Sequence, residues 1–157
     1  MRLSNVQYYF KSRDDVLTAM VTRYFDDCAE VVKRLTAENA AATQRERVHF
    51  LVCAGLAHGQ DVSEMCRAFR EIWAISSRNS VIDQCLAQYY RRFADTLARS
   101  ALNGDADPAT SSRLKALLVP YFEGYSVTAP ALDLTPDAAA DMLTDLALSI
   151  LNAQDSP

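Results

Sequence analysis

Cysteine and histidine are the residue types in this chain best suited to metal binding or thiol chemistry. The 157 residues include four cysteines and two histidines, namely Cys28, Cys53, Cys66, Cys85, His49 and His58. No two cysteines form a C-x-x-C pair, and neither histidine has a partner at the spacing of a zinc site. Each cysteine falls on or beside an expected apolar helix face. We therefore expect reduced core cysteines, no metal site and no disulfide framework, with a thiol-based sensor as the alternative.

The sequence contains no motif that would support catalysis. It has no G-x-S-x-G, no Walker-type phosphate loop and no H-E-x-x-H. It also lacks an acid, base or nucleophile pair at a spacing that would bring the two groups together. We therefore expect neither an enzyme nor a bound cofactor, and a small helical enzyme or carrier is kept as an alternative.

Aromatic residues gather in the middle of the chain. They are Phe69, Trp73, Tyr89, Tyr90 and Phe93. At helical spacing such residues fill a bundle core. The alternative is that some of them line an apolar cavity, in which tyrosine hydroxyls, His58, Arg67 or Arg70 orient a ligand, because ligand sites are mostly apolar with a few placed polar groups. For His58 itself, a surface or capping role is the simpler interpretation.

The elements that position these residues are predicted to be helices. Half of the residues are hydrophobic, 23% are charged, and there are only four glycines and five prolines. Apolar residues recur every three or four positions, which predicts helices over residues 12–35, 44–59, 63–77, 80–103, 108–126 and 136–152. The expected fold is all-α, with about six helices, a short helical stub at the N-terminus and no sheet. No apolar run approaches the roughly 18 residues of a membrane span, so we expect a cytoplasmic protein with no membrane partner.

Two cap-plus-proline pairs mark where the last helices begin. Asp107-Pro108 and Thr135-Pro136 each place a capping side chain before a proline at the first helical position. Pro120 lies about a dozen residues inside the first of these helices. A proline there removes a backbone hydrogen bond, so we expect a kink or a break.

Charge is unevenly distributed along the chain. Residues 1–35 carry six Lys and Arg against five acids, whereas residues 36–157 carry ten against fifteen, for a net charge of −4. DNA binding needs clustered cations to neutralise phosphates. Any affinity for nucleic acid should therefore come from the N-terminal edge.

That edge carries the most specific pattern of the chain. A short aromatic helix is expected to end at Phe10, and Ser12 then opens the long helix with Asp15 as its capping-box partner. These residues resemble the TetR family of bacterial transcriptional regulators, in which an aromatic-rich "Y-x-H-F" type motif ends the recognition helix. A Ser or Asn cap, a basic residue, two acids and two aliphatic residues follow it there. A helix-turn-helix needs a supporting helix before the recognition helix, so we expect this chain to lack most of that headpiece.

The resemblance implies two parts, a headpiece remnant at residues 1–11 and an effector-binding and dimerisation domain at residues 12–157. The residues that it places at DNA are Ser4, Asn5, Gln7, Tyr8, Tyr9, Lys11 and Arg13. Glutamine can reach a base edge in the major groove, with adenine as its favoured partner. The tyrosines and the cations are plausible phosphate contacts, although Tyr8 and Tyr9 can instead pack between headpiece and long helix.

The resemblance also implies where an effector binds and how two chains pair. Residues 44–103 would form the walls of a pocket for a small apolar effector, and the residues expected there are His58, Phe69, Trp73, Tyr89 and Phe93. Residues 108–126 and 136–152 would form a homodimer interface, whose expected residues are Leu118, Tyr121, Phe122, Met142, Leu143, Leu146 and Ile150.

The function that the resemblance implies is that of an effector-responsive transcriptional regulator, a repressor. Effector binding would move the helix over residues 12–35 and change the separation of the two headpieces. Operator DNA would be a partner only in a full-length form. The alternative is a natural protein without a headpiece, which pairs with a complete relative and prevents its DNA binding.

Overall fold

The described part of the chain is an all-α bundle. The computed structural model describes residues 9–38, 43–60, 64–102 and 107–153, without the side chains of positions 35, 58–60 and 64–69. Its helices are α2 (Arg13–Glu38), α3 (Gln44–Gln60), α4 (Glu64–Ser76), α5 (Ser80–Leu102), α6 (Pro108–Thr128) and α7 (Pro136–Asn152), with a short 3₁₀ helix, η1 (Ala129–Ala131), after α6. The predicted helix ranges agree with these bounds to within three residues at each end. The all-α fold is therefore confirmed.

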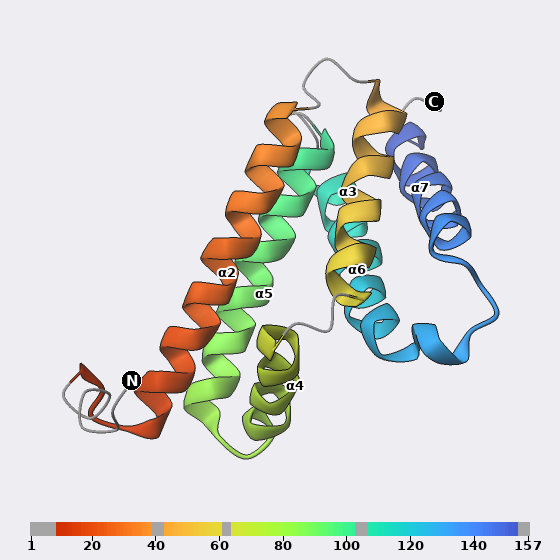
Figure 1. Cartoon of the computed structure of the whole chain (residues 1–157). Coiled ribbons are helices and arrows are strands. Elements are labelled where there is room, and N and C mark those ends of the chain that lie inside the picture. Colours follow the sequence, from red (N-terminus) through yellow and green to blue (C-terminus); the bar gives the residue numbers. More distant parts are fainter. Residues whose placement is uncertain (1–8, 39–42, 61–63, 103–106, 154–157) are drawn as a thin grey trace.

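The long helices α2 and α5 lie side by side, and α4 packs at one end of this pair (Figure 1). Their shared core is rich in aromatic and aliphatic side chains, because both helices turn one apolar stripe inward. The buried residues of this first core are Val21, Tyr24, Phe25, Cys28, Ile72, Ile82, Leu86 and Tyr89.

Helices α3, α6 and α7 pack together beside the α2–α5 pair (Figure 1). Their core contains Val48, Leu51, Val52, Leu56, Leu114, Leu118, Phe122, Tyr125, Ala139, Ala140, Leu143, Ala147 and Leu151, with Val32 of α2 and Leu97 and Ala101 of α5. Small residues on α7 let it approach α3 closely. Helix α5 therefore contributes to both cores, and Phe93 on α5 packs against both.

Helix starts follow from local capping. Ser12 accepts a hydrogen bond from the Asp15 backbone N–H at 3.1 Å, and the Asp15 carboxylate accepts one from the Ser12 N–H at 2.9 Å. Asp107 caps α6 by accepting from the N–H groups of Ala109 and Thr110, and the Thr135 hydroxyl accepts from the Ala138 N–H at 3.3 Å to cap α7. All three predicted caps are confirmed.

Proline 120 does not break its helix. α6 runs from Pro108 to Thr128 across Pro120, so the break that we allowed for at this position is wrong. Both turns around the proline are held by buried neighbours, since Leu118 and Phe122 sit in the core at 2% and 5% exposure. Tertiary packing can offset the backbone hydrogen bond that proline removes.

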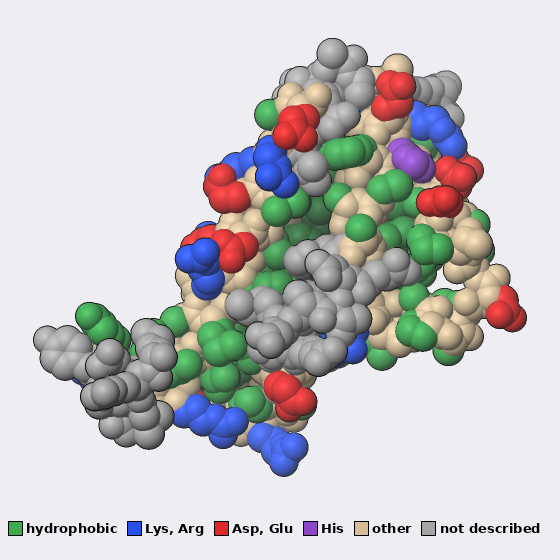
Figure 2. Space-filling view, in the orientation of Figure 1, with side chains coloured by type: hydrophobic (Ala, Val, Ile, Leu, Met, Phe, Trp, Pro, Cys, Tyr) green, Lys and Arg blue, Asp and Glu red, His purple; other side chains and the backbone are tan. Residues whose placement is uncertain are grey.

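The outer face of α2 carries charges of both signs (Figure 2). Its ion pairs join residues three or four positions apart, Arg23 with Asp27, Lys33 with Glu30 and Arg34 with Glu38. Such exposed pairs contribute little stability but mark a solvated face. Within the described helices, none combines the length and apolar character that a membrane span requires.

Candidate functional site

The aromatic residues of α5 form a cluster centred on Tyr89, which joins α5 to α2. The Tyr89 ring lies 5.9 Å from the ring of Tyr24 and 6.0 Å from that of Phe25, both on α2. On its own helix it stacks with Phe93 at 5.8 Å and meets Tyr90 edge-on at 4.9 Å. These separations are those of favourable aromatic pairs. A change in the position of Tyr89 would therefore alter its ring contacts with Tyr24 and Phe25 of α2.

One edge of this cluster is polar and involves three helices. The Tyr90 hydroxyl of α5 is buried, and it has no hydrogen bond of standard geometry among the described residues. Trp73 of α4 and Glu123 of α6 nevertheless lie beside it, close enough to influence its pKa. The indole N–H can donate to the Tyr90 oxygen, and the Tyr90 O–H can donate to the carboxylate. A buried hydroxyl without a well-formed partner is the kind of group that a ligand or a water can satisfy.

Burial dominates the protonation chemistry of this edge. It raises the pKa of Glu123 above its ordinary value of 4.5, although the neighbouring Tyr90 hydroxyl acts in the opposite direction. Burial also raises the pKa values of Tyr89 and Tyr90 well above 10, and the charge of Glu123 adds to both increases. The two phenols therefore stay protonated, while the Glu123 carboxyl group lacks the solvation that an ionised acid needs.

A hydrogen bond between α4 and α6 closes the same region. The Arg70 guanidinium on α4 donates to the backbone carbonyl of Ser126 on α6 at 2.7 Å. Trp73, one turn further along α4, leaves 54% of its surface exposed. Side chains of α4, α5 and α6 thus meet at this edge of the cluster, where the Trp73 indole is partly exposed.

The effector residues expected from the sequence are only partly placed. Tyr89 is buried in the α2–α4–α5 core, Phe93 is half-buried between the two cores, and Trp73 is more than half exposed. The side chains of His58 and Phe69 lie outside the described residues, so their roles stay predictions. Sequence reasoning missed Glu123. It is the only charged residue between Lys115 and Asp133, and that isolation within an apolar segment was the available signal.

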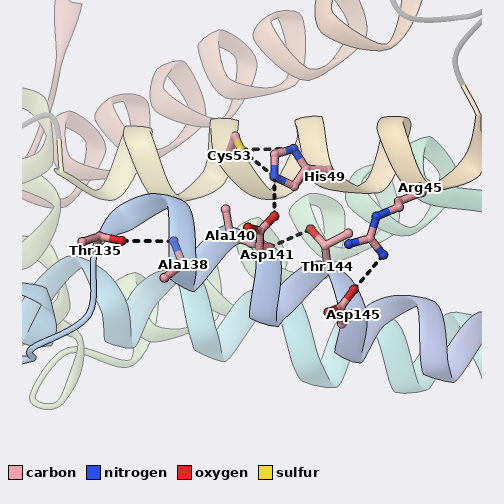
Figure 3. Close-up of polar contacts among 9 residues, drawn as sticks. All are labelled: Arg45, His49, Cys53, Thr135, Ala138, Ala140, Asp141, Thr144 and Asp145. Atoms are coloured by element: carbon pink, nitrogen blue, oxygen red, sulfur yellow. Dashed lines mark hydrogen bonds and ion pairs between the residues drawn. The ribbon is translucent and has the colours of Figure 1, made fainter.

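A second group of polar residues lies on the seam between α3 and α7 (Figure 3). Arg45 pairs with Asp145 at 2.7 Å, and His49 Nε2 lies 3.2 Å from Asp141. The His49 ring also lies against the sulfur of Cys53, 3.6 Å from Nδ1. These contacts orient α7 on α3, but most of the side chains are solvent-exposed and each pair contributes little by itself.

The cysteines whose side chains the structure describes form no disulfide. Cys28 is buried and Cys53 and Cys85 are half-buried, while the side chain of Cys66 is not described. Burial raises the pKa values of Cys53 and Cys85, and for Cys53 the charges of Asp137 and Asp141 raise it further. A raised pKa reduces the reactive thiolate. In the same part of the chain, no three His, Cys, Asp or Glu side chains gather as metal ligands would.

Comparison with known proteins identifies the family. The chain is 39% identical over 156 residues to a protein of Xanthobacter autotrophicus described as an uncharacterized HTH-type transcriptional regulator in the dhlA 5' region. The match covers 99% of this chain and 77% of that relative. This chain belongs to the HTH-type transcriptional regulators. No family model and no solved structure matches it.

For an HTH-type regulator, the residues expected at DNA are the first to locate. Ser4, Asn5, Gln7 and Tyr8 lie outside the described residues. Tyr9 and Lys11 precede α2 and Arg13 begins it; all three are exposed, and the exposed fraction of Tyr9 is 73%. All seven assignments at DNA stay predictions, as does the division of the regulator into residues 1–11 and 12–157.

The regulator's expected dimer residues fall into two groups. Leu118, Phe122 and Leu143 are at most 5% exposed and belong to the core of the chain itself. Met142 and Leu146, one turn apart on α7, are 41% and 46% exposed. Tyr121 and Ile150 are half-buried and pack against the core. Only the exposed and half-buried residues have surface to offer to a second chain.

Proposed function

We propose that this chain is a TetR-type regulator that represses transcription as a homodimer and is released from DNA by a small effector. The effector binds against the polar edge of the aromatic cluster, between α4, α5 and α6. The N-terminal resemblance supports the TetR type, and the relative in Xanthobacter autotrophicus supports regulation of transcription. Operator DNA is the proposed partner of the homodimer.

The single observation that carries the effector response is the contact of Tyr89 with α2. Tyr89 neighbours the proposed site through Tyr90, and its ring meets Tyr24 and Phe25 across the α2–α5 interface. Helix α2 leads directly from the segment that resembles a recognition helix, since its capping box begins at Ser12. A ligand that displaces Tyr89 or Tyr90 would therefore disturb side chains packed against α2, the helix that follows the proposed DNA-binding segment.

The response would be a shift between two arrangements of α2. An effector that binds one arrangement more tightly favours it in proportion to the difference in affinity. In a dimer, the two headpieces must reach half-sites about 34–36 Å apart. A small pivot of α2 would alter that spacing, and affinity for the operator would fall.

The homodimer is supported by apolar surface at the C-terminal end. The nine large hydrophobic residues exposed in the described chain include five on α6, on α7 or on the segment that joins them, namely Val127, Leu132, Leu134, Met142 and Leu146. Figure 2 shows hydrophobic side chains at the surface near the α6–α7 connection. A concentration of apolar surface of this kind is typical of a protein interface, and a second copy of the chain is its proposed occupant.

DNA binding of the protein tests the proposal. Affinity for the DNA upstream of its own gene is measured by fluorescence anisotropy with and without a ligand that binds the chain. We expect the ligand to weaken DNA binding. Equal affinity of the ligand-bound and free forms would disprove the effector response.

A pair of variants tests the route through α2. Phe25→Leu alters the ring contact with Tyr89 and should reduce the effect of the ligand on DNA binding while leaving ligand binding intact. Val31→Ala is the control, because Val31 lies on the same helix at 43% exposure. An equal response in both variants would exclude the Tyr89 contact as the route.

A further inference from the structure

We infer that Asn79 is a positioning residue, whose side-chain amide joins the start of α5 to the first turn of α2 and so orients the proposed DNA-binding segment, residues 4–13. The inference rests on the proposed function for the role of that segment. It depends on three features of the described residues: a hydrogen bond between Asn79 and Asp14, the second contact of the same amide, and the place of Asp14 in α2.

The hydrogen bond joins two parts of the chain that are distant in sequence. Asn79 lies between α4 and α5, and its Nδ2 donates to Oδ1 of Asp14 at 2.9 Å, across 65 positions of the sequence. Asp14 is the second residue of α2. The start of α2 and the α4–α5 connection lie at the same end of the bundle (Figure 1). An amide that donates to a carboxylate makes a charge-assisted hydrogen bond, which is stronger than one between neutral groups.

The other end of the same amide caps α5. Asn79 Oδ1 accepts hydrogen bonds from the backbone N–H groups of Val81 at 3.0 Å and Ile82 at 3.3 Å. The two sets of contacts fix the orientation of the amide, because a flipped group would turn its NH₂ toward these N–H donors and its oxygen toward the Asp14 carboxylate. The cap therefore holds the Asn79 amide in the orientation in which it can donate to α2.

Asp14 is half-buried at the start of α2. The capping-box hydrogen bonds between Ser12 and Asp15 join neighbours in sequence, so they shape the first turn without attaching it to the rest of the bundle. The bond from Asn79 supplies such an attachment, three residues before Leu17, which packs against the first core. Fixing this turn restricts the directions that the proposed DNA-binding segment can take, and a restrained segment loses less entropy when it binds.

Exchanging the two side chains separates the contact from the cap. Asn79→Asp keeps an oxygen for the cap of α5, where Asp and Asn are about equally favourable, but it removes the donor and sets two carboxylates against each other. The rescue variant adds Asp14→Asn, which restores a hydrogen bond in the reverse direction. The matched control combines Asn79→Asp with Asp83→Asn. Asp83 is exposed on α5, so the control has the net charge of the rescue variant without its contact.

Amide exchange measured by NMR reports the attachment of the first turn. The N–H groups of Leu17 and Thr18 donate to carbonyls of that turn in an α-helix that begins at Arg13. In Asn79→Asp they should exchange about threefold to tenfold faster, because local opening no longer breaks the bond to Asp14. The change at Val32, buried near the other end of α2, should be much smaller. The rescue variant should recover slow exchange and the control should not.

DNA affinity shows whether the attachment orients the DNA-binding segment. Affinity for the DNA upstream of the protein's own gene, measured by fluorescence anisotropy, should fall about threefold to tenfold in Asn79→Asp. It should recover in the rescue variant and stay low in the control. A role in stability alone would leave the DNA affinity of the folded variants unchanged, and far-UV circular dichroism checks that each variant is folded.

The results separate the inference from the proposed function. The inference would be overturned if the rescue variant behaved like Asn79→Asp, if the control recovered as the rescue variant does, or if Asn79→Asp bound DNA as tightly as the unsubstituted protein or more tightly. The proposed function would survive each of these results if a ligand still weakened DNA binding. Absence of DNA binding by the unsubstituted protein would disprove the proposed function, and the exchange pattern alone would then decide whether Asn79 positions α2.

Discussion

Gly55 of α3 lies directly against the ring of Phe122 of α6. A Cβ atom placed on Gly55 would come within 2.5 Å of the ring carbon Cζ, far inside van der Waals contact. Glycine at this position therefore sets how closely α3 and α6 approach, and Phe122 fills the space that a side chain would occupy. Because Phe122 is itself 5% exposed, the ring has little room to move away.

Gly55→Ala should consequently destabilise the protein by about 1–3 kcal/mol, the usual cost of overpacking a filled core. Gly124 offers a matched control, since it is exposed on α6 and a Cβ atom placed on it would have no other atom within 4 Å. Gly124→Ala should stabilise by about 0.5–1 kcal/mol through helix propensity. Urea unfolding measures both changes, and a stabilising effect at Gly55 would contradict the close approach.

The cap of α7 should contribute measurable stability. Thr135→Ala removes the hydroxyl that accepts from the Ala138 N–H, and its expected cost is about 1 kcal/mol. Thr135→Ser retains the oxygen and should cost much less. Thermal denaturation of the two variants distinguishes the cap from the loss of the γ-methyl group, because both variants lose that methyl group and only Thr135→Ala loses the hydroxyl.

Stability should depend on pH through Glu123. The pKa of this acid is raised in the folded state, so its contribution is fully present below its ordinary value of 4.5 and is lost as pH rises through the folded value. Glu123→Gln should remove that loss and leave the variant the more stable form at neutral pH. Urea midpoints between about pH 4 and pH 8 show the difference.

Glu46 provides a control of opposite sign for this pH dependence. Its pKa is lowered because the Thr43 hydroxyl and the Thr43 backbone N–H both donate hydrogen bonds to its carboxylate, just before the start of α3. Its contribution is present above its ordinary pKa and is lost as pH falls through the folded value. Glu46→Gln should therefore reduce the acid-side loss of stability. If the stability of Glu123→Gln and of Glu46→Gln changed with pH in the same way, the causes assigned to the two pKa shifts would be contradicted.

Two leucines on α7 should separate folding from association. Leu143→Ala empties a fully buried position and should cost about 2–5 kcal/mol at any protein concentration. Leu146→Lys changes a side chain that is 46% exposed. It should leave the fold intact and shift sedimentation equilibrium from dimer toward monomer. A dimer unaffected by this charge would place the interface elsewhere.

Cys53 should react slowly with alkylating reagents. Burial raises the pKa of its thiol first, and the carboxylates of Asp137 and Asp141 raise it further. Asp141→Asn should lower that pKa and speed alkylation by iodoacetamide severalfold near about pH 8. Asp145→Asn, one turn away and paired with Arg45, should have little effect. Mass spectrometry of the Cys53 peptide measures both rates.

The helices and their caps could be predicted from the sequence because these signals are local. Ser12, Asp107 and Thr135 act on N–H groups within a few residues, so their neighbours in sequence are also their neighbours in space. The effect of Pro120 was not local. Its helix continues because buried residues on both sides hold it in the core.

The candidate site could be predicted only in part, since its groups come from three helices. Trp73, Tyr89 and Phe93 are expected at an effector site because aromatic residues are conspicuous in one stretch of sequence, and that role stays a prediction. Glu123 was not found, because its neighbours Tyr90 and Trp73 are far from it in sequence. Periodicity likewise could not distinguish the buried face of α7, at Leu143, from the exposed one, at Leu146.

Helix α5 has a consequence for the energetics of the whole chain. This helix supplies side chains to both cores, and Phe93 packs against both. Loss of packing in either core would therefore expose one face of α5 to solvent. Unfolding should therefore be a single cooperative transition, with amide protection along α5 approaching that of global opening. For the same reason, a destabilising substitution in one core should lower the free energy of unfolding of the whole bundle and not only that of the helices around the substitution.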